Sequence, residues 1–376
     1  MKIYVDCIGC EQRKLDAQFV IDYITSCGGE TSKSPQECDY AVLVTCAVDR
    51  TSENESVNRL DSLSRAIPKN ARLVVGGCLP SISPGKISEY KIHATFSPRN
   101  NDSLSKVFER AESADIVSYP NRSTFDSRGE SSESVSAREE YESAKRGFKV
   151  TINDGCLSKC SYCVIRDATG KLKSKDPKYV IDQVKRGVSE EEKTIMLLGG
   201  DTGAYGVDIG TGFHDLLRSV LEIPGDYGLF IHDFNVNWLI RNRSFYLDVF
   251  SSENGKKIKS ANFPIQSGSN RILRFMKRPY TSEEVVDSLK SVKDVAPHMK
   301  QGTHVMVGFP GEGEHEFSET VSILNEINFD FITCFPYSEH KSADSAKLDG
   351  KVSVAEVNER IDRLTEEFRE KIKVIW

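Results

Sequence analysis

Residues 152–163 read INDGCLSKCSYC, in which Cys156, Cys160 and Cys163 have the spacing C-x3-C-x2-C. The stretch follows an apolar segment of strand length and forms a glycine-containing loop. Three thiolates can hold three irons of a [4Fe–4S] cluster and leave the fourth iron open. The alternative is a structural zinc site, which normally needs four ligands, and no fourth ligand lies close in the sequence. The spacing therefore favours a cluster whose open iron can chelate S-adenosylmethionine (SAM).

Outward from this loop, strand and helix patterns alternate along the chain. Strands are expected at 148–153, 194–198, 229–232, 260–265, 302–307 and 329–335, with helices between them, as at 282–295 and 314–326. Six such repeats predict a partial (β/α)6 TIM barrel over residues 147–345, with its chemistry at the carboxyl ends of the strands. Residues 346–376 are expected to form a C-terminal helical segment, with a charged amphipathic helix at 354–374.

Residues 1–115 predict a second, smaller α/β unit. Its strands are expected at 2–5, 39–45, 71–76 and 93–97, and its helices at 15–25, 52–66 and 104–111, which indicates a parallel sheet. Cys10, Cys46 and Cys78 each follow a predicted strand end, and such ends share one edge of a parallel sheet. They could hold a second cluster, or they could be unrelated buried cysteines. Residues 116–146 are rich in Ser, Glu and Arg and are predicted to be a linker.

Composition narrows the class of protein. The 376 residues carry a net charge of −6, which excludes nucleic-acid binding through overall positive charge but leaves room for a local basic groove. No apolar run approaches the ~20 residues that span a bilayer, and no signal peptide is recognisable, so we expect a cytoplasmic protein without a membrane partner. In that compartment the ten cysteines indicate metal binding or catalysis more than disulfides.

At this point the chain resembles a known family. The C-x3-C-x2-C motif with Tyr162 before its last cysteine, together with three upstream cysteines on a separate domain, resembles the radical SAM methylthiotransferases. Seven co-linear segments carry the resemblance: IGCEQRKLDAQ, LVTCAVDRTSENE, LVVGGCLP, INDGCLSKCSYC, LLGGDTGAYG, FPIQSGSNRILRFMKRPYT and VMVGFPGEGEHEF. INDGCLSKCSYC and DTGAYGVDIGT look most like the archaeal and eukaryotic enzymes that act on N6-threonylcarbamoyladenosine 37 of tRNA.

The resemblance implies a flavodoxin-like N-terminal methylthiotransferase domain and a radical SAM partial barrel. It implies two [4Fe–4S] clusters, one on each set of three cysteines. One SAM molecule would methylate a sulfur held at the N-terminal cluster. A second would be cleaved to a radical that abstracts a substrate hydrogen, so that C–H becomes C–SCH3.

Partners also follow from the resemblance. We expect a tRNA substrate, or a protein, peptide or small molecule if recognition has diverged. An electron donor such as flavodoxin or ferredoxin is implied, and we expect a monomer. Two rival hypotheses remain: a radical SAM enzyme whose N-terminal cluster only relays electrons, and a non-enzymatic RNA-binding or scaffold protein.

The resemblance also assigns a SAM site, and each assignment has a structural alternative. Gly199, Gly200 and Asp201 would bind the amino group, or form a strand-to-helix turn. Gln266 and Ser267, with Ser269, would meet the ribose or carboxylate, or form a turn and N-cap. Adenine would contact Tyr162 and the segment Val307, Gly308, Phe309, which otherwise are packing residues and a barrel turn. The four basic residues Arg271, Arg274, Lys277 and Arg278 would meet phosphates, or form a solvated helix face.

The sequence departs from the family in five places. We expect no C-terminal TRAM β-barrel. Thr169, and Phe230 or His232, stand where arginines are usual, and FPYSEHKSADSAKL lacks the usual Arg-x-Gly-Thr-Pro segment. Val44 and Arg13 stand where asparagines are common. The six candidate cluster ligands are intact, so we expect the radical chemistry to persist while substrate recognition has diverged.

Overall fold

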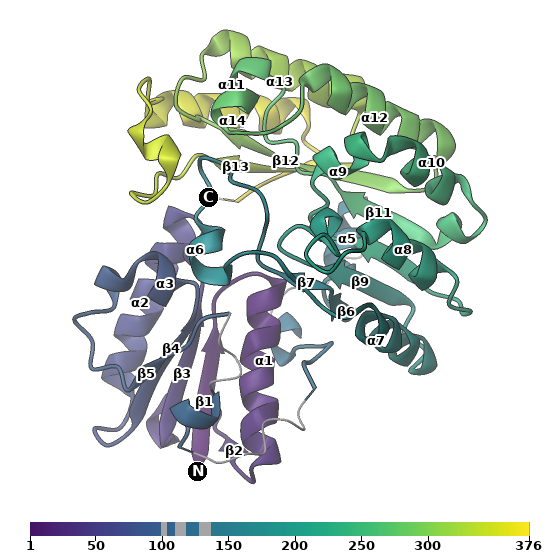
Figure 1. The fold of residues 1–376 in the computed structure, drawn as a ribbon. Coiled ribbons are helices and arrows are strands. Elements are labelled where there is room, and N and C mark those ends of the chain that lie inside the picture. The colour runs from purple at the N-terminus through teal and green to yellow at the C-terminus, as the bar shows by residue number, and fades with distance from the viewer. Residues whose placement is uncertain (99–103, 110–117, 128–136, 376) are drawn as a thin grey trace. The chain divides into compact units, whose positions relative to one another are not determined.

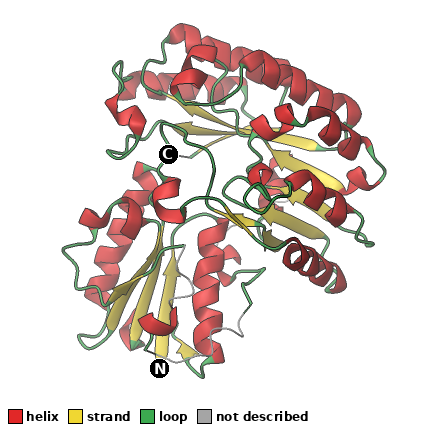
Figure 2. Ribbon diagram, in the orientation of Figure 1, coloured by secondary structure: helices red, strands yellow, loops and turns green. Residues whose placement is uncertain are grey.

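A computed structural model describes residues 1–98, 104–109, 118–127 and 137–375. The chain divides into two compact units. Unit 1 comprises residues 1–130 and 164–171, and unit 2 comprises residues 131–163 and 172–376. Both units are α/β with parallel main sheets, as the strand–helix alternation predicts (Figures 1 and 2).

Unit 1 is built on a five-stranded sheet in the order β2-β1-β3-β4-β5, and all its pairings are parallel. The strands are β1 (Lys2–Cys7), β2 (Glu30–Thr31), β3 (Tyr40–Thr45), β4 (Arg72–Gly77) and β5 (Ala94–Thr95). The helices are α1 (Glu11–Ser26), α2 (Arg50–Ala66), α3 (Leu79–Ile82), α4 (Leu104–Val107) and α6 (Ile165–Thr169). Of the helix expected at 104–111, residues 110–111 lie outside the described residues.

Both faces of this sheet are covered, which explains why β3 is buried at every position and apolar from Ala41 to Val44. Val42 and Val44 point to one side, where they join a core with Val20 of α1. Ala41 and Leu43 point to the other side and pack with Leu60 of α2. Successive side chains of a strand alternate between faces, so a strand buried on both sides needs a continuous apolar run.

Two segments remote in sequence complete unit 1. Ala168 of α6 is buried in the core on the α2 side of the sheet. Residues 118–127 pack on α1, where the Tyr119 ring lies 5.7 Å from that of Phe19 and Tyr119 Oη donates to Asp16 Oδ1 at 2.7 Å. These residues fall within the predicted 116–146 linker, of which residues 116–117 and 128–136 lie outside the described part.

Unit 2 is built on a seven-stranded parallel sheet in the order β14-β13-β12-β11-β10-β9-β6. Its strands are β6 (Phe148–Thr151), β9 (Thr194–Leu198), β10 (Gly228–Ile231), β11 (Ile258–Asn262), β12 (Lys300–Val307), β13 (Phe331–Pro336) and β14 (Ile372–Val374). A separate antiparallel pair joins β7 (Asn153–Asp154) to β8 (Lys173–Ser174). All six strands predicted for the barrel are present, within a few residues of the expected bounds.

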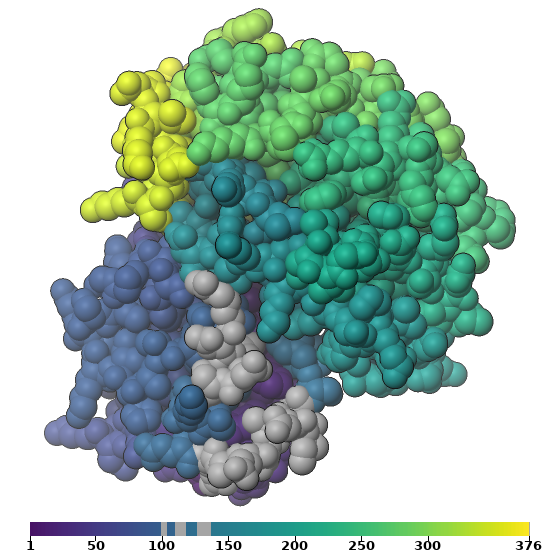
Figure 3. Space-filling view, in the orientation of Figure 1, coloured from purple at the N-terminus to yellow at the C-terminus, as the bar shows by residue number. Residues whose placement is uncertain are grey.

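The helices of unit 2 are α5 (Ala137–Ala144), α7 (Pro177–Ser189), α8 (Phe213–Leu221), α9 (Val236–Arg241), α10 (Arg243–Ser251), α11 (Asn270–Phe275), α12 (Ser282–Val295), α13 (Glu314–Ile327) and α14 (Val354–Glu367). The long helices α7, α8, α10, α12 and α13 line the outer face of the curved sheet (Figure 1). One continuous core fills the space between them and the strands. In the space-filling view, the green and yellow segments of this unit pack without a break (Figure 3).

The C-terminal end differs from the prediction of one helix over 354–374. Helix α14 ends at Glu367, and Ile372–Val374 pairs in parallel with β13 as a seventh strand. Ile372 and Val374 both pack against the main core of unit 2, and the sheet edge offers unpaired backbone groups. Helical spacing in the sequence did not reveal this edge, because the pairing partner lies about forty residues upstream in the chain. None of the described helices is long and apolar enough to cross a membrane.

Candidate functional site

Three cysteines of unit 1 follow the carboxyl ends of three adjacent strands. Cys10 comes three residues after β1, and Cys46 and Cys78 directly follow β3 and β4. Strands β1, β3 and β4 are neighbours in the sheet, so these thiols share one edge, as the sequence predicted. Cys46 and Cys78 are buried, and Cys10 is exposed at the start of α1.

Backbone and hydroxyl contacts fix this edge. Ser56 of α2 accepts from the Cys46 N–H at 3.1 Å and donates to the Cys46 carbonyl at 2.7 Å. The Cys78 N–H donates to the Thr45 carbonyl at 2.9 Å. Gly77 has a φ of +88°, and a Cβ there would lie 2.3 Å from the Thr45 carbonyl oxygen, so only glycine allows this approach. The positions of Cys46 and Cys78 are therefore set by the strands and not by flexible loops.

The three thiols act on one another electrostatically. Burial is the main cause that raises the pKa of Cys46, and the neighbouring Cys78 and Cys10 add to it. Burial likewise raises the pKa of Cys78 to about 11, although the cation of Arg13 opposes the shift. Buried thiols such as Cys46 and Cys78 favour a cation that can bind their deprotonated forms together.

The remaining cysteines of this unit belong to a strand, a turn and a helix end. Cys7 is the last residue of β1 and half-buried, and its thiol pKa is raised by burial first and by Cys10 second. The Cys38 thiol donates to the Pro35 carbonyl at 3.2 Å, and Cys27 forms the C-cap of α1.

In unit 2, hydrogen bonds from Ser158 and Ser161 hold the loop with the C-x3-C-x2-C motif in place. Ser161 donates through its N–H to the Met276 carbonyl at 3.1 Å and through Oγ to the Phe275 carbonyl at 2.7 Å. The Ser158 N–H donates to the Cys156 sulfur at 3.3 Å. Burial and the nearby Asp201 carboxylate raise the pKa of Cys156 to about 11, while the Ser158 contacts lower it. All three thiols of the motif are half-buried, so they stay accessible to a ligand.

Gly199 and Gly200 pack against the start of this loop. A Cβ on Gly199 would lie 2.4 Å from Asn153 Oδ1, and a Cβ on Gly200 would lie 2.3 Å from the Gly155 carbonyl oxygen. Asn153 also accepts from the Gly200 N–H at 3.1 Å and donates to the Asp201 carbonyl at 2.9 Å. The two glycines therefore let the end of β9 approach the cysteine loop closely.

Asp201 is buried, and both of its carboxylate oxygens are already engaged. Trp238 Nε1 donates to Oδ2 at 3.0 Å, and the Asn235 N–H donates to Oδ1 at 3.3 Å. Burial raises the pKa of Asp201 to about 6 in spite of these donors. The sequence singles out Asp201 but gives Trp238 no role, because nothing in its neighbours indicates which group its indole meets.

Gln266 and Ser267 occupy a tight turn between β11 and α11. Gln266 has a φ of +72°, and its backbone bonds on both sides to β12, through the His304 carbonyl and the Met306 N–H, each at 2.8 Å. Ser267 Oγ accepts from the Ser269 N–H at 3.1 Å. The Ser267 side chain thus stabilises the turn, and the backbone of Gln266 extends the sheet.

The segment after β12 is held by a buried ion pair. Val307 and Phe309 are buried in the protein, and the Phe309 ring meets that of Tyr162 edge-on at 6.4 Å. The Gly308 N–H donates to Glu312 Oε1 at 2.9 Å, and Arg360 of α14 donates to the same oxygen at 3.0 Å. Helix α14 therefore fixes this turn through Glu312.

The four basic residues predicted as one group separate in the structure. Lys277 pairs with Asp344 at 2.6 Å and Arg271 with Glu316 at 2.8 Å, both at the surface. Arg278 is buried instead, donates to the Pro264 carbonyl at 3.1 Å, and lies within electrostatic range of Cys160 and Asp201. A cation beside the cysteine loop was not visible in the sequence, where Arg278 was one of several charges on a helix.

The two cysteine sets differ from a site for a single metal ion. Within the described ranges, no three His, Cys, Asp or Glu side chains converge tightly enough to hold a single metal ion. A [4Fe–4S] cluster takes each thiolate on a different iron and so needs a wider arrangement of sulfurs than a single metal ion does. Each cysteine set brings three thiols, on one short loop or at one sheet edge, which is the type of ligand that such a cluster takes. The residues therefore fit clusters better than mononuclear metal.

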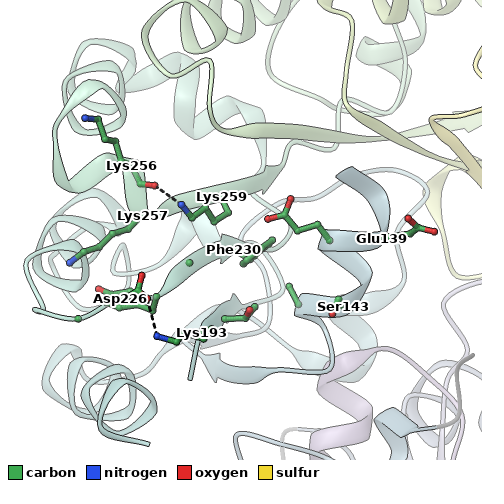
Figure 4. A pocket seen from close by; sticks show the side chains of 14 residues that line it. Glu139, Ser143, Lys193, Asp226, Phe230, Lys256, Lys257 and Lys259 are labelled. Atoms are coloured by element: carbon green, nitrogen blue, oxygen red, sulfur yellow. Dashed lines mark hydrogen bonds and ion pairs between the residues drawn. The ribbon is translucent and has the colours of Figure 1, made fainter. Parts of the chain in front are cut away.

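A pocket of about 570 Å³ lies elsewhere, at the amino-terminal ends of β9, β10 and β11 (Figure 4). Lys193, Lys256, Lys257 and Lys259 line it, and Lys193 pairs with Asp226 at 2.9 Å across it. The cysteine loop and the glycines follow the opposite, carboxyl ends of the strands, so this pocket is not part of the site.

Known proteins resemble this chain in sequence, and others resemble it in fold. Residues 150–324 match the Radical SAM superfamily, and residues 2–96 match a family described as Uncharacterized protein family UPF0004. Probable threonylcarbamoyladenosine tRNA methylthiotransferase of Pyrococcus horikoshii is 30% identical over 92% of this chain and 79% of its own length. tRNA-2-methylthio-N(6)-dimethylallyladenosine synthase of Pelotomaculum thermopropionicum is 30% identical over 95% of this chain and 79% of its own length.

Among solved structures, the radical SAM methyltransferase TsrM from Kitasatospora setae superposes with a TM-score of 0.59 at 14% identity. The match covers 89% of this chain and 74% of that one, and it supports the fold alone. The fold and the cysteine loop thus define a radical SAM enzyme. More specifically, the chain belongs to the radical SAM methylthiotransferase family, as its sequence resemblance implied.

Proposed function

We propose that the protein inserts a methylthio group at a substrate C–H bond with two [4Fe–4S] clusters. Cys156, Cys160 and Cys163 would hold one cluster, and Cys10, Cys46 and Cys78 the other. The observation that carries the proposal is the position of Cys10, Cys46 and Cys78 after the carboxyl ends of three adjacent strands. Structural cysteines have no reason to recur at one edge of a sheet, whereas ligands of one cluster must converge.

When bound, the two clusters would supply the electron that cleaves SAM and the site that presents the sulfur. The protein's own contribution is to place and insulate these groups. Ser158 stabilises a thiolate at Cys156 through its N–H, and Ser161 ties the loop to the end of α11. In unit 1, Ser56 and Thr45 hold the backbone of Cys46 and Cys78. Buried, pre-positioned ligands limit the reorganisation that electron transfer requires.

For SAM itself we propose a site along the carboxyl ends of β9, β11 and β12. Gly199 and Gly200 would let the amino group approach the backbone beside the cysteine loop. Asp201 would orient this region through Trp238 and Asn235, since both of its oxygens are engaged. The other members of the proposed site are Tyr162, Gln266, Ser267, Val307, Gly308 and Phe309, of which Val307 and Phe309 would contribute backbone and packing.

We further propose a tRNA substrate modified at a threonylcarbamoyladenosine, with flavodoxin or ferredoxin as the electron donor. Support comes from the Pyrococcus relative, whose name specifies threonylcarbamoyladenosine tRNA and whose similarity spans nearly the whole chain. The cationic Arg274, exposed on α11 near the carboxyl end of β11, could meet a phosphate.

A protein or peptide is the second candidate substrate, and one observation favours it. Arg271 and Lys277 are already paired with Glu316 and Asp344. Phe230, which with His232 is one of two candidates for a usual arginine position, is buried. Fewer cations are then free for phosphates than the sequence suggested. Direct comparison of methylthiolation of tRNA and of protein fractions separates the two candidates.

Anaerobic reconstitution with iron and sulfide tests the chemistry. The wild type should hold about eight irons per chain, and the triple Cys→Ala variant of either cysteine set should hold about four. Incubation with tRNA and SAM carrying a deuterated methyl group should then yield a deuterated methylthio nucleoside by mass spectrometry. Loss of all iron in the Cys156/Cys160/Cys163 variant would show that unit 1 holds no cluster and would sink the proposal.

A further inference from the structure

Arg13 is a buried cation beside the three cysteines of unit 1. It lies in the first turn of α1, three residues after Cys10, and only 2% of its surface is exposed. Its side chain runs past Gly9: a Cβ built on Gly9 would lie 2.9 Å from Arg13 Cγ and 3.4 Å from Cys46 Cβ. The aliphatic part of the Arg13 side chain and the Cys46 side chain thus both lie next to Gly9.

One carboxylate neutralises Arg13 only in part. Nη1 of Arg13 lies 3.1 Å from Asp16 Oδ2, and Tyr119 Oη donates to the other oxygen of Asp16 at 2.7 Å. Within the described part of the chain, Nε of Arg13 is buried and has no hydrogen-bond partner. A buried guanidinium group with an unused donor is costly, and such groups are normally satisfied by a ligand or water.

The cysteines supply the missing negative charge. Burial opposes the charge of Arg13, but Asp16 and then Cys78 and Cys10 more than offset it and raise the pKa of Arg13. Arg13 follows Cys10 by three residues on α1, and the aliphatic part of its side chain borders the Cys46 side chain, so a buried positive charge lies beside these thiols. Asp16 follows three residues further along the helix, so Arg13 is the member of the pair on the side of Cys10.

Residues 118–127 pack along α1 beside the ion pair of Arg13 and Asp16. Besides the Tyr119 bond to Asp16, Ser123 Oγ donates to the Lys14 carbonyl at 3.1 Å and Thr124 N–H donates to Gln18 Oε1 at 3.0 Å. These contacts fasten the segment along α1 over the first turns that carry Arg13. A charge pair shielded from solvent is weakly screened, so its effect on a neighbouring group is large and persists at high salt.

We propose that Arg13 stabilises the reduced, more negatively charged state of the [4Fe–4S] cluster on Cys10, Cys46 and Cys78, and thereby sets its reduction potential. The inference rests on the proposed function, because it requires that cluster. Net charge and hydrogen bonds around a cluster are the main protein factors that set its potential. Arg13 is thus a positioning residue for charge and takes no part in the bonds that form or break.

The test uses the full chain with Cys156, Cys160 and Cys163 replaced by Ala, so that only the cluster of unit 1 remains. In this background, the midpoint potential is measured by electron paramagnetic resonance during a redox titration. The double variant Arg13→Met/Asp16→Asn removes both members of the ion pair, so no buried charge is left uncompensated. Arg65→Met is the control for a general effect of charge, because it removes one positive charge from an exposed position of α2.

The double variant should keep about four irons per chain. Its potential should fall enough to change the ratio of oxidised to reduced cluster at least tenfold, about 59 mV for a one-electron couple. The single variant Arg13→Lys keeps the positive charge, so its midpoint potential should stay close to that of the protein with Arg13. Arg65→Met should leave the midpoint potential unchanged. A folded double variant with four irons and an unchanged potential overturns the role of Arg13 alone. Absence of iron from the Cys156/Cys160/Cys163→Ala background overturns the cluster on unit 1, and this inference with it.

Discussion

The indole Nε1 of Trp238 donates a hydrogen bond of 3.0 Å to Oδ2 of Asp201, beside the cysteine loop of unit 2. Asp201 is only 3% exposed, and the Asn235 N–H occupies its other oxygen. The end of β9 and the start of α9 are therefore joined through one buried carboxylate. This contact makes Asp201 a structural anchor of the region that the cysteine loop and the two glycines form.

The protonation of Asp201 should give stability a distinctive pH dependence. Burial raises its pKa from 3.8 in the unfolded chain to about 6. Because the folded value is the higher one, the stabilising contribution is complete below pH 3.8 and is lost as the pH rises through about 6. Relative to Asp201→Asn, the wild type should lose on the order of 3 kcal/mol over this window. Urea unfolding of both proteins at a series of pH values measures this loss in the free energy of unfolding. If the free energies of the two proteins change with pH in the same way, the pKa of Asp201 is not raised.

Removal of Arg360 should destabilise unit 2 strongly. Its partner Glu312 is buried and also accepts from the Gly308 N–H, so Arg360→Met leaves an uncompensated buried carboxylate. We expect a loss of about 3–5 kcal/mol in the free energy of unfolding. Arg363→Met on the same helix breaks an exposed pair with Glu314 and should cost under about 1 kcal/mol. Equal effects of the two variants would show that burial of the Glu312 pair is unimportant.

A methyl group on Gly200 should disturb the cysteine loop. Its Cβ would lie 2.3 Å from the Gly155 carbonyl oxygen, so the loop must shift. In a chain with Cys10, Cys46 and Cys78 replaced by Ala, Gly200→Ala should reduce the iron content well below about four per chain. Gly85→Ala is the control, because a Cβ there meets nothing within 4 Å. Full iron content in Gly200→Ala would mean that the loop tolerates displacement.

Cys46→Ala should separate the two halves of the reaction. Formation of 5′-deoxyadenosine depends on the cysteine loop of unit 2 and should continue, whereas methylthiolated product should disappear. Cys38→Ala is the matched control: this buried cysteine of unit 1 bonds to the Pro35 carbonyl and should leave both products unchanged. A methylthiolated product from Cys46→Ala would refute its role in sulfur transfer. No such product even from the wild type would favour the electron-relay hypothesis.

Much of this picture was available from the sequence because it depends on local order. The spacing of Cys156, Cys160 and Cys163 brings three thiols onto one short loop, whatever surrounds it. Apolar runs gave the strands of both sheets, since a parallel strand buried on both faces is apolar throughout. From those strands the shared edge of Cys10, Cys46 and Cys78 followed, because parallel strands end on the same side.

Other features came only from the tertiary structure, and each depends on which distant residues meet. Arg278 and Arg13 look like ordinary surface cations in the sequence, but packing buries them near cysteines. Trp238 lies in no motif of the sequence, yet its indole meets Asp201. Residues 372–374 were predicted as helix from their spacing. They form strand β14 instead, because pairing with β13 outweighs the local preference. The sequence thus determined the candidate ligands and the class of chemistry. The fold decided which charges surround them, because burial, and not residue type, sets the strength of an electrostatic interaction.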